Sequence, residues 1–288
     1  MLIADGWVQY KILDSGDGEK VEFWNGILLR RPDPQVIWPW QMPERIREDV
    51  HGLYHRSKSG GGEWECRKQM PKSWTITYNN LTFRIEPTSF KHTGLFPEQA
   101  VNWEWMTEKI QAADHPVNVL NLFAYTGGAT CACLAAGASV CHVDASKGMI
   151  AWAKENVRLS GLSDKPVRFM MDDCIKFVER EIRRGRRYDA VIMDPPSYGR
   201  GPGGELWKLE DTLYSLVDVL KDVLSDHPLF FLLNSYTTGF SSQVSSNILR
   251  LNLVAKFGGL VTEGEVGLPI ADKGLILPCG TFARWENG

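Results

Sequence analysis

Carboxylates stand directly after three short apolar runs of this chain, at positions suited to binding a ligand. Asp144 follows the run 138–143, Asp172 and Asp173 follow 167–171, and Asp194 follows 188–193. An acidic side chain at the end of a second strand can accept hydrogen bonds from ribose hydroxyls. An aspartate after the third strand could accept a hydrogen bond from an adenine amino group. These residues therefore predict a nucleoside site.

The segment Asp194-Pro195-Pro196-Ser197-Tyr198 could orient a second reactant. Its prolines stiffen the backbone and remove donors, which leaves carbonyl oxygens to face a substrate amine. Tyr198 offers a flat surface on which a base could stack. An in-line group transfer mainly requires such alignment. We expect Asp194, Pro195, Pro196 and Tyr198 to orient the acceptor; a stiffened loop that only ends the strand is the alternative.

A loop of small residues precedes these segments. The apolar run 117–123 leads into Ala124-Tyr125-Thr126-Gly127-Gly128, and a small-residue helix is expected at 129–136. Strand, glycine loop and helix form the opening unit of a doubly wound sheet, and the loop lies where such sheets bind ligands. It does not read G-x-G-x-x-G, the pattern that admits a pyrophosphate. It favours adenosine without phosphate, and S-adenosylmethionine (SAM) is the usual such ligand.

The elements that position these residues alternate between strand and helix. Strands are expected at 117–123, 138–143, 167–171, 188–193 and 229–233, with helices at 97–112, 146–160, 209–224 and 240–256. Two further strands, near 259–268 and 275–286, end the chain. This alternation predicts an α/β fold with a mostly parallel sheet and an antiparallel C-terminal edge.

The N-terminal third differs, and we expect a small β-rich domain at 1–88 before a main domain at 89–288. Strands are predicted at 7–13 and 21–29, separated by a turn cluster at 14–18. Asn79-Asn80 can form a two-residue hairpin turn. Pairing Tyr78 with Leu81 then places Ile76 opposite Phe83 and Trp74 opposite Ile85.

Taken together, these motifs resemble those of class I SAM-dependent methyltransferases. The resemblance rests on NLFAYTGGAT at 121–130, Asp144, the aspartates at 172–173 and DPPSYG at 194–199. KHTGLFPEQ at 91–99 is similar, more narrowly, to the bacterial large-subunit ribosomal RNA methyltransferase I/K-like group. The similarity covers roughly residues 74–288. It implies a Rossmann-like class I methyltransferase sheet, SAM as cofactor and RNA as the substrate.

The resemblance also assigns residues to the cofactor. Segment 91–99 would cover SAM, the glycine loop would hold its methionine part, Asp144 its ribose and Asp173 its adenine. The cofactor-binding residues expected on this basis are Thr93, Phe96, Phe123, Ala124, Tyr125, Thr126, Gly127, Gly128, Asp144, Ala145, Ser146, Asp173, Cys174 and Asp194.

One departure from the group concerns the chemistry. Members that methylate carbon 5 of cytosine carry a Ser-Cys-Ser motif after the fifth strand, whereas this chain has Tyr236 where the cysteine would stand. Asp194-Pro-Pro supplies no thiol either. Direct attack by a nitrogen or an oxygen needs no nucleophilic side chain, so we expect methyl transfer without a cysteine.

Composition limits the partners. The net charge is −3 and the pI about 6.1, so any RNA binding must be local. The six cysteines have no regular spacing, which favours buried free thiols in a reducing cytoplasm. His51 and His55 lack a third ligand, so no metal is predicted, and neither a signal peptide nor a membrane span is expected. The sequence leaves the oligomeric state open.

Two basic clusters and three other functions remain as alternatives. The arginines at 180–187 are expected to solvate a helix end, whereas Lys58, Arg67, Lys68 and Lys72 could meet a phosphate backbone. Methylation of a small molecule or a protein would suit the acidic composition. A SAM-binding module without catalysis and a nicotinamide-dependent oxidoreductase are the other candidates; the missing third glycine disfavours the latter.

Overall fold

A computed structural model describes residues 1–57, 61–89, 91–200 and 206–288 of the chain, in two compact units. Unit 1 comprises residues 1–2, 101–266 and 279–288, and unit 2 comprises residues 3–100 and 267–278. Lys58, one of the proposed phosphate ligands, lies outside the described residues. The domain boundary near residue 88 remains a prediction; the unit changes between Ala100 and Val101.

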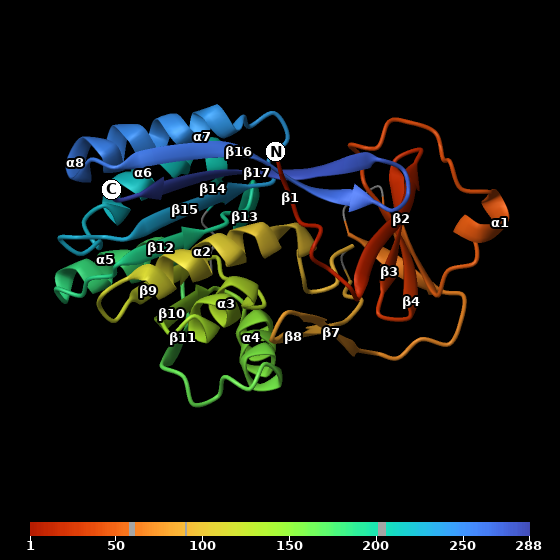
Figure 1. Ribbon diagram of the computed structural model, residues 1–288, viewed down its shortest axis with the longest axis horizontal. Helices are drawn as coiled ribbons and strands as arrows, with labels where there is room; N and C mark the ends of the chain where they lie inside the picture. The colour runs from red at the N-terminus through yellow and green to blue at the C-terminus, as the bar shows by residue number, and fades with distance from the viewer. Residues whose placement is uncertain (58–60, 90, 201–205) are drawn as a thin grey trace. The chain divides into compact units, whose positions relative to one another are not determined.

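Unit 1 contains the predicted α/β sheet (Figure 1). The strands of the sheet, in spatial order, are β11 (Val167–Met171), β10 (Ser139–Asp144), β9 (Asn118–Leu122), β12 (Ala190–Met193), β15 (Phe230–Ser235), β17 (Leu275–Glu286) and β16 (Leu260–Ile270). Residues 267–270 of β16 and 275–278 of β17 belong to unit 2. The pairs from β11 to β15 are parallel, whereas β17 runs antiparallel to β15. The predicted mostly parallel sheet with an antiparallel C-terminal edge is confirmed.

Helices cover both faces of this sheet. One layer consists of α2 (Ala100–Ala112), α3 (Gly128–Ala135) and α4 (Lys147–Leu159), and the other of α5 (Cys174–Arg183), α6 (Leu209–Leu220) and α7 (Ser242–Leu249). A π-helical turn (Arg250–Val254) and α8 (Ala255–Phe257) continue α7. The described residues contain no helix that could span a bilayer.

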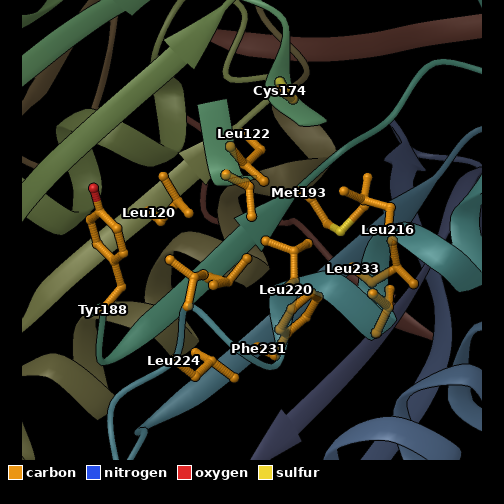
Figure 2. Close-up of a cluster of buried hydrophobic side chains, with 14 of the residues drawn as sticks. Leu120, Leu122, Cys174, Tyr188, Met193, Leu216, Leu220, Leu224, Phe231 and Leu233 are labelled. Atoms are coloured by element: carbon orange, nitrogen blue, oxygen red, sulfur yellow. The ribbon is translucent and has the colours of Figure 1, made fainter. Parts of the chain in front are cut away.

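The main hydrophobic core lies between the sheet and the second layer. Alternate strand residues such as Leu120, Leu122, Met193 and Leu233 point to this face, where Leu216 and Leu220 of α6 meet them (Figure 2). Because helices bury both faces, the strands are apolar almost throughout, as parallel strands usually are. This explains why simple apolar runs located them in the sequence.

Unit 2 is built from short strands. β2 (Tyr10–Gly16), β3 (Glu19–Trp24), β4 (Ile27–Pro32), β5 (Gly52–Arg56) and β6 (Gly62–Cys66) pair in that order, and β7 (Trp74–Tyr78) pairs with β8 (Leu81–Ile85). Three short elements, β1 (Leu2–Ile3), α1 (Glu44–Arg47) and a 3-10 turn (Pro97–Gln99), complete the part of the chain before α2.

The hairpin register was predicted correctly, but one strand was not. Tyr78 pairs with Leu81, Ile76 with Phe83 and Trp74 with Ile85. In contrast, the single strand expected at 21–29 is wrong, because the chain turns at Asn25-Gly26, with φ angles of 46° and 92°. Asn-Gly is the strongest two-residue hairpin signal, and it separates β3 from β4 here.

A buried ion pair holds β3 and β4 together in unit 2. Arg31 donates from Nε to Glu22 Oε2 (2.6 Å) and from Nη2 to Glu22 Oε1 (2.7 Å), and the Tyr10 hydroxyl donates to the same carboxylate at 2.8 Å. Burial alone would raise the pKa of Glu22, but Arg31 and Lys20 outweigh it and lower the pKa to about 2. The pair is therefore ionised at neutral pH.

Replacing Glu22→Gln should destabilise the chain by about 3–5 kcal/mol, because Arg31 would remain buried without a compensating charge. Since the folded pKa of about 2 lies below the unperturbed 4.5, ionised Glu22 stabilises fully above pH 4.5. That stabilisation is lost as the pH falls through 2. Urea unfolding of both forms between pH 7 and pH 2 measures the difference. Asp218→Asn, which breaks a partly exposed pair with Lys221, is the control and should change stability by less than about 1 kcal/mol.

Candidate functional site

The carboxyl ends of four neighbouring strands lie level in unit 1. Leu122 of β9 pairs with Val143 of β10 and with Met193 of β12, and Met193 pairs with Leu233 of β15. The next residues along these strands are Phe123, Asp144, Asp194 and Asn234. The glycine loop, Asp144 and the loop that begins at Asp194 therefore lie at one edge of the sheet. The segment after β15, residues 234–237, begins at the same edge. The strand order reverses between β9 and β12, which is where open α/β sheets bind ligands.

The glycine loop owes its shape to backbone angles that few residues adopt. Phe123, Tyr125 and Gly127 have φ angles of 53°, 50° and 83°. The Ala124 N–H donates to the Val143 carbonyl (3.1 Å), and the Asn156 side chain donates to the Thr126 carbonyl (2.8 Å). A Cβ at Gly128 would lie 2.8 Å from Trp103 Cζ2. A side chain at position 128 would therefore clash with the Trp103 ring, which explains the glycine there.

Asp144 is fixed between this loop and the start of α4. Its Oδ2 accepts the Tyr125 N–H (2.9 Å) and its Oδ1 accepts the Ser146 N–H (2.8 Å), while Ser146 caps the helix. Burial raises the pKa of Asp144, and the two backbone donors partly oppose this shift. A carboxylate can accept about four hydrogen bonds, so capacity remains for ribose hydroxyls.

The aspartates after β11 have different partners. Asp172 forms an ion pair with Arg180, and its Oδ1 accepts the Asp173 N–H at 2.9 Å. Asp173 Oδ1 caps α5 by accepting the Lys176 N–H (2.9 Å). Cys174 is buried, which raises its pKa to about 12. Cys174 therefore remains a neutral thiol. Because Asp173 accepts one backbone N–H through Oδ1, its carboxylate can still accept a hydrogen bond from an adenine amino group.

The loop predicted to orient the acceptor continues into a hairpin that was not expected. β13 (Tyr198–Arg200) pairs with β14 (Leu206–Lys208), and Tyr198 is 58% exposed. Ser197 Oγ lies 2.6 Å from Thr237 Oγ1, so this loop contacts the segment after β15. The Pro196 carbonyl accepts the Trp207 Nε1–H at 2.5 Å. The expectation of unoccupied proline carbonyls was therefore wrong for Pro196.

Trp207 lies beside the candidate site and was not predicted from the sequence. Its ring lies 5.3 Å from the Phe123 ring, while its N–H holds Pro196. One side chain thus joins the glycine loop to the acceptor loop. In the sequence, Trp207 is marked only by its position shortly after a proline–glycine segment. That pattern predicts neither the contact with Phe123 nor the hydrogen bond to Pro196.

A buried polar network supports the end of β15. Asn102 of α2 donates to Asn234 (3.0 Å) and accepts two hydrogen bonds from Arg284 at 3.0 and 2.6 Å. Burial lowers the pKa of Arg284 to about 10. This network fixes the backbone that leads to Thr237, beside the acceptor loop.

Two predicted cofactor residues belong to unit 2. Thr93 is fully buried, and its hydroxyl has no hydrogen-bond partner among the described residues. Phe96 is half-buried, and its ring lies 5.2 Å from that of His92. Burial lowers the pKa of His92 to about 4, so this histidine is neutral. A role for Thr93 and Phe96 over the cofactor remains a prediction.

The proposed phosphate ligands of unit 2 have acidic partners. Arg67 pairs with Glu48 and Glu65, and Lys68 pairs with Asp49 at 2.7 Å. These carboxylates already compensate both charges, which weakens the hypothesis of RNA binding there. In the part of the chain that the structure describes, no three His, Cys, Asp or Glu side chains gather as metal ligands would.

Comparison with known sequences identifies relatives of this chain. A family model described as S-adenosylmethionine-dependent methyltransferase matches residues 43–217. A protein named ribosomal RNA large subunit methyltransferase K/L, from Pseudoalteromonas atlantica, is 34% identical over 170 residues, which are 59% of this chain and 23% of that protein. A protein of the same name from Shewanella sp. (strain MR-4) is 28% identical over 191 residues, 65% of this chain and 24% of that one. The matched region is thus about a quarter of these relatives.

Solved structures agree with this result. The SAM-dependent methyltransferase from Agrobacterium tumefaciens is 36% identical, with a TM-score of 0.95 over 100% of this chain and 93% of that one. A Streptococcus mutans protein described as a SAM-dependent methyltransferase has a TM-score of 0.72 at 17% identity over 98% of this chain and 76% of that one, which shows a shared fold alone. The family match covers more than half of the chain, and its motifs lie at the strand ends of a shared fold. The chain belongs to the S-adenosylmethionine-dependent methyltransferase family.

Proposed function

We propose that this methyltransferase modifies RNA, with ribosomal RNA as the first candidate, by direct transfer to a nitrogen or an oxygen. The observation that carries the proposal is the position of Asp194, which follows a strand end level with that of β9, together with the exposed ring of Tyr198 on the same loop. Aromatic rings of this kind stack on unpaired bases. The names of the curated relatives support an RNA substrate.

The residues at the strand ends fit SAM. When bound, SAM supplies an electrophilic methyl group. The glycine loop contributes backbone and the rings of Phe123 and Tyr125 rather than cationic side chains, which suits a ligand without phosphate. Asp144 would hold the ribose, with Ala145 and Ser146 beside it, and Asp173 and Cys174 would border the adenine. Asp194 would align the acceptor, since its strand end adjoins the glycine loop.

The cysteines support transfer without a covalent enzyme intermediate. All six lie in the described part of the chain as free thiols; Cys131, Cys133, Cys141 and Cys174 are buried as expected, whereas the expectation is wrong for the exposed Cys66 and the half-buried Cys279. Burial raises the pKa of each of the four buried thiols. None follows β12 or β15 at the acceptor site. Free thiols also suit the reducing cytoplasm proposed for this enzyme.

A small molecule or a protein remains the second candidate substrate. The net charge of −3 favours it, and so does the short match to the ribosomal RNA methyltransferases. These relatives contain much additional chain that could bind RNA.

Transfer of tritium from labelled SAM decides between these substrates. An unmodified large-subunit ribosomal RNA transcript should gain label that ribonuclease removes and protease does not. RNA containing 5-fluorocytidine should form no adduct that survives a denaturing gel. Label only in the protein or small-molecule fraction would instead support the second candidate, and a stable adduct would contradict direct transfer.

Substitutions of acceptor residues should lower turnover, whereas substitution of a cofactor residue should weaken SAM binding. Asp194→Ala and Tyr198→Ala should lower turnover by on the order of a hundredfold, since misalignment affects the transfer step. SAM affinity, measured by calorimetry, should change little in both variants. Asp144→Ala should instead weaken SAM binding strongly, because the ribose hydroxyls lose a charged acceptor. If Asp194→Ala abolishes SAM binding in step with turnover, Asp194 belongs to the cofactor site alone.

Trp207 should position the acceptor loop. Trp207→Phe keeps the ring beside Phe123 but removes the hydrogen bond to Pro196, so turnover should fall by roughly 2–10-fold at unchanged SAM affinity. Trp207→Ala removes both contacts and should have the larger effect. Tyr214→Phe, an exposed aromatic on α6, serves as the control. Equal turnover in Trp207→Phe and wild type would show that the hydrogen bond has no positioning role.

A further inference from the structure

A pocket of about 390 Å³ opens at the opposite edge of the unit 1 sheet. Its lining includes Asn118, Ser139 and Val167, which begin β9, β10 and β11, and Tyr188, which precedes β12. The proposed SAM site lies at the carboxyl ends of the same strands. A strand of five residues spans about 16 Å, so the two sites are separate. A pocket of this size can hold a small ligand.

Three arginines give the pocket its chemical character. Arg168, Arg186 and Arg187 line it together with Tyr188 and Cys141. Their side chains come from β11 and from the segment before β12, so residues distant in sequence converge on one opening. From the sequence, the 180–187 arginines were expected only to solvate a helix end. The pocket was not foreseen, because Arg168 and the strand starts that complete it are far away in sequence.

One buried carboxylate, Glu181, pairs with two of these arginines and with the neighbouring Arg184. Glu181 is fully buried and lies 3.3 Å from Arg168, 3.3 Å from Arg184 and 3.7 Å from Arg186, and it accepts the Tyr188 hydroxyl at 2.7 Å. The guanidinium groups of Arg168, Arg184 and Arg186 thus share the single negative charge of Glu181. Their contacts with Glu181 restrain the side chains, which reduces the entropy lost when an anion binds.

Arg187 adds a further positive charge. Its guanidinium donates to the Arg186 carbonyl (3.1 Å), and it forms no ion pair with the described residues. A second carboxylate beside the lining, Asp189, accepts the Asn118 N–H at 2.8 Å. The pocket therefore has a surplus of positive charge that a dianion could compensate.

We propose that this pocket binds a phosphate group, carried by a mononucleotide or by an RNA backbone. Arginine recognises phosphate through paired N–H donors, and Arg186 and Arg187 present such donors at an exposed rim. Val140, Pro166 and Val167 add apolar wall beside the cations, against which a ribose or a base could lie. The proposal concerns binding alone, since burial raises the pKa of Cys141 and leaves no reactive thiol there.

The double variant Arg186→Gln/Arg187→Gln tests the proposal in the full chain. Calorimetry with adenosine monophosphate and with inorganic phosphate, each in the presence of saturating SAM, should show binding to wild type that the double variant weakens about tenfold or more. Lys154→Gln/Arg158→Gln removes two positive charges from α4, outside the pocket, and should bind as wild type does. Equal melting temperatures of the three proteins exclude loss of folding as the cause.

Salt titrations of RNA binding distinguish the two sources of phosphate. If the pocket holds backbone phosphates, the slope of log K against log salt should become less negative by about 1.4–1.8 in the double variant. An unchanged slope together with weakened adenosine monophosphate binding assigns the pocket to a free nucleotide. No difference between the pocket variant and the control variant with any of these probes overturns the proposal. Methyl transfer to RNA is assayed separately in the same variants, so a non-RNA substrate would disprove the proposed function without affecting the nucleotide result.

Discussion

The level register of the parallel strands is the constraint on which the proposed site depends. Leu122, Val143, Met193 and Leu233 occupy equivalent positions in four adjacent strands, and each is buried. A shift of one residue in any strand would turn its core side chains to the other face. The same shift would displace the loop that follows. Core packing therefore sets the relative heights of the glycine loop, Asp144 and Asp194.

Strand register sets the height of these residues, and hydrogen bonds to the backbone then fix the orientation of their side chains. Asp144 is held by two N–H donors from different elements, so its carboxylate is oriented before any ligand arrives. Ala153 packs against Gly127 and Trp103 packs against Gly128, which restricts the movement of the loop. The site thus combines a rigid cofactor side with an acceptor side that rests on the Ser197–Thr237 and Pro196–Trp207 hydrogen bonds.

The sequence predicted the elements whose signals are local. The strands of unit 1 are apolar runs between helices, and the 74–85 hairpin follows from its alternation and its Asn-Asn turn. The Asn25-Gly26 turn carried an equally local signal that was overlooked. The Asn102–Asn234–Arg284 network joins residues up to 182 positions apart, and no pattern in the sequence links them. Trp207 belongs to the same class, because its contacts exist only once β13 and β14 pair.

The distribution of the cysteines has a consequence for handling the protein. Oxidants and alkylating reagents attack thiolates, and a buried thiol with a raised pKa supplies almost none at neutral pH. Four of the six cysteines are protected in this way, Cys279 is half-buried, and Cys66 is exposed on β6. Mild maleimide treatment should therefore place a fluorophore first on Cys66, in unit 2. As the one exposed thiol of the chain, Cys66 is a suitable position for following ligand binding by fluorescence.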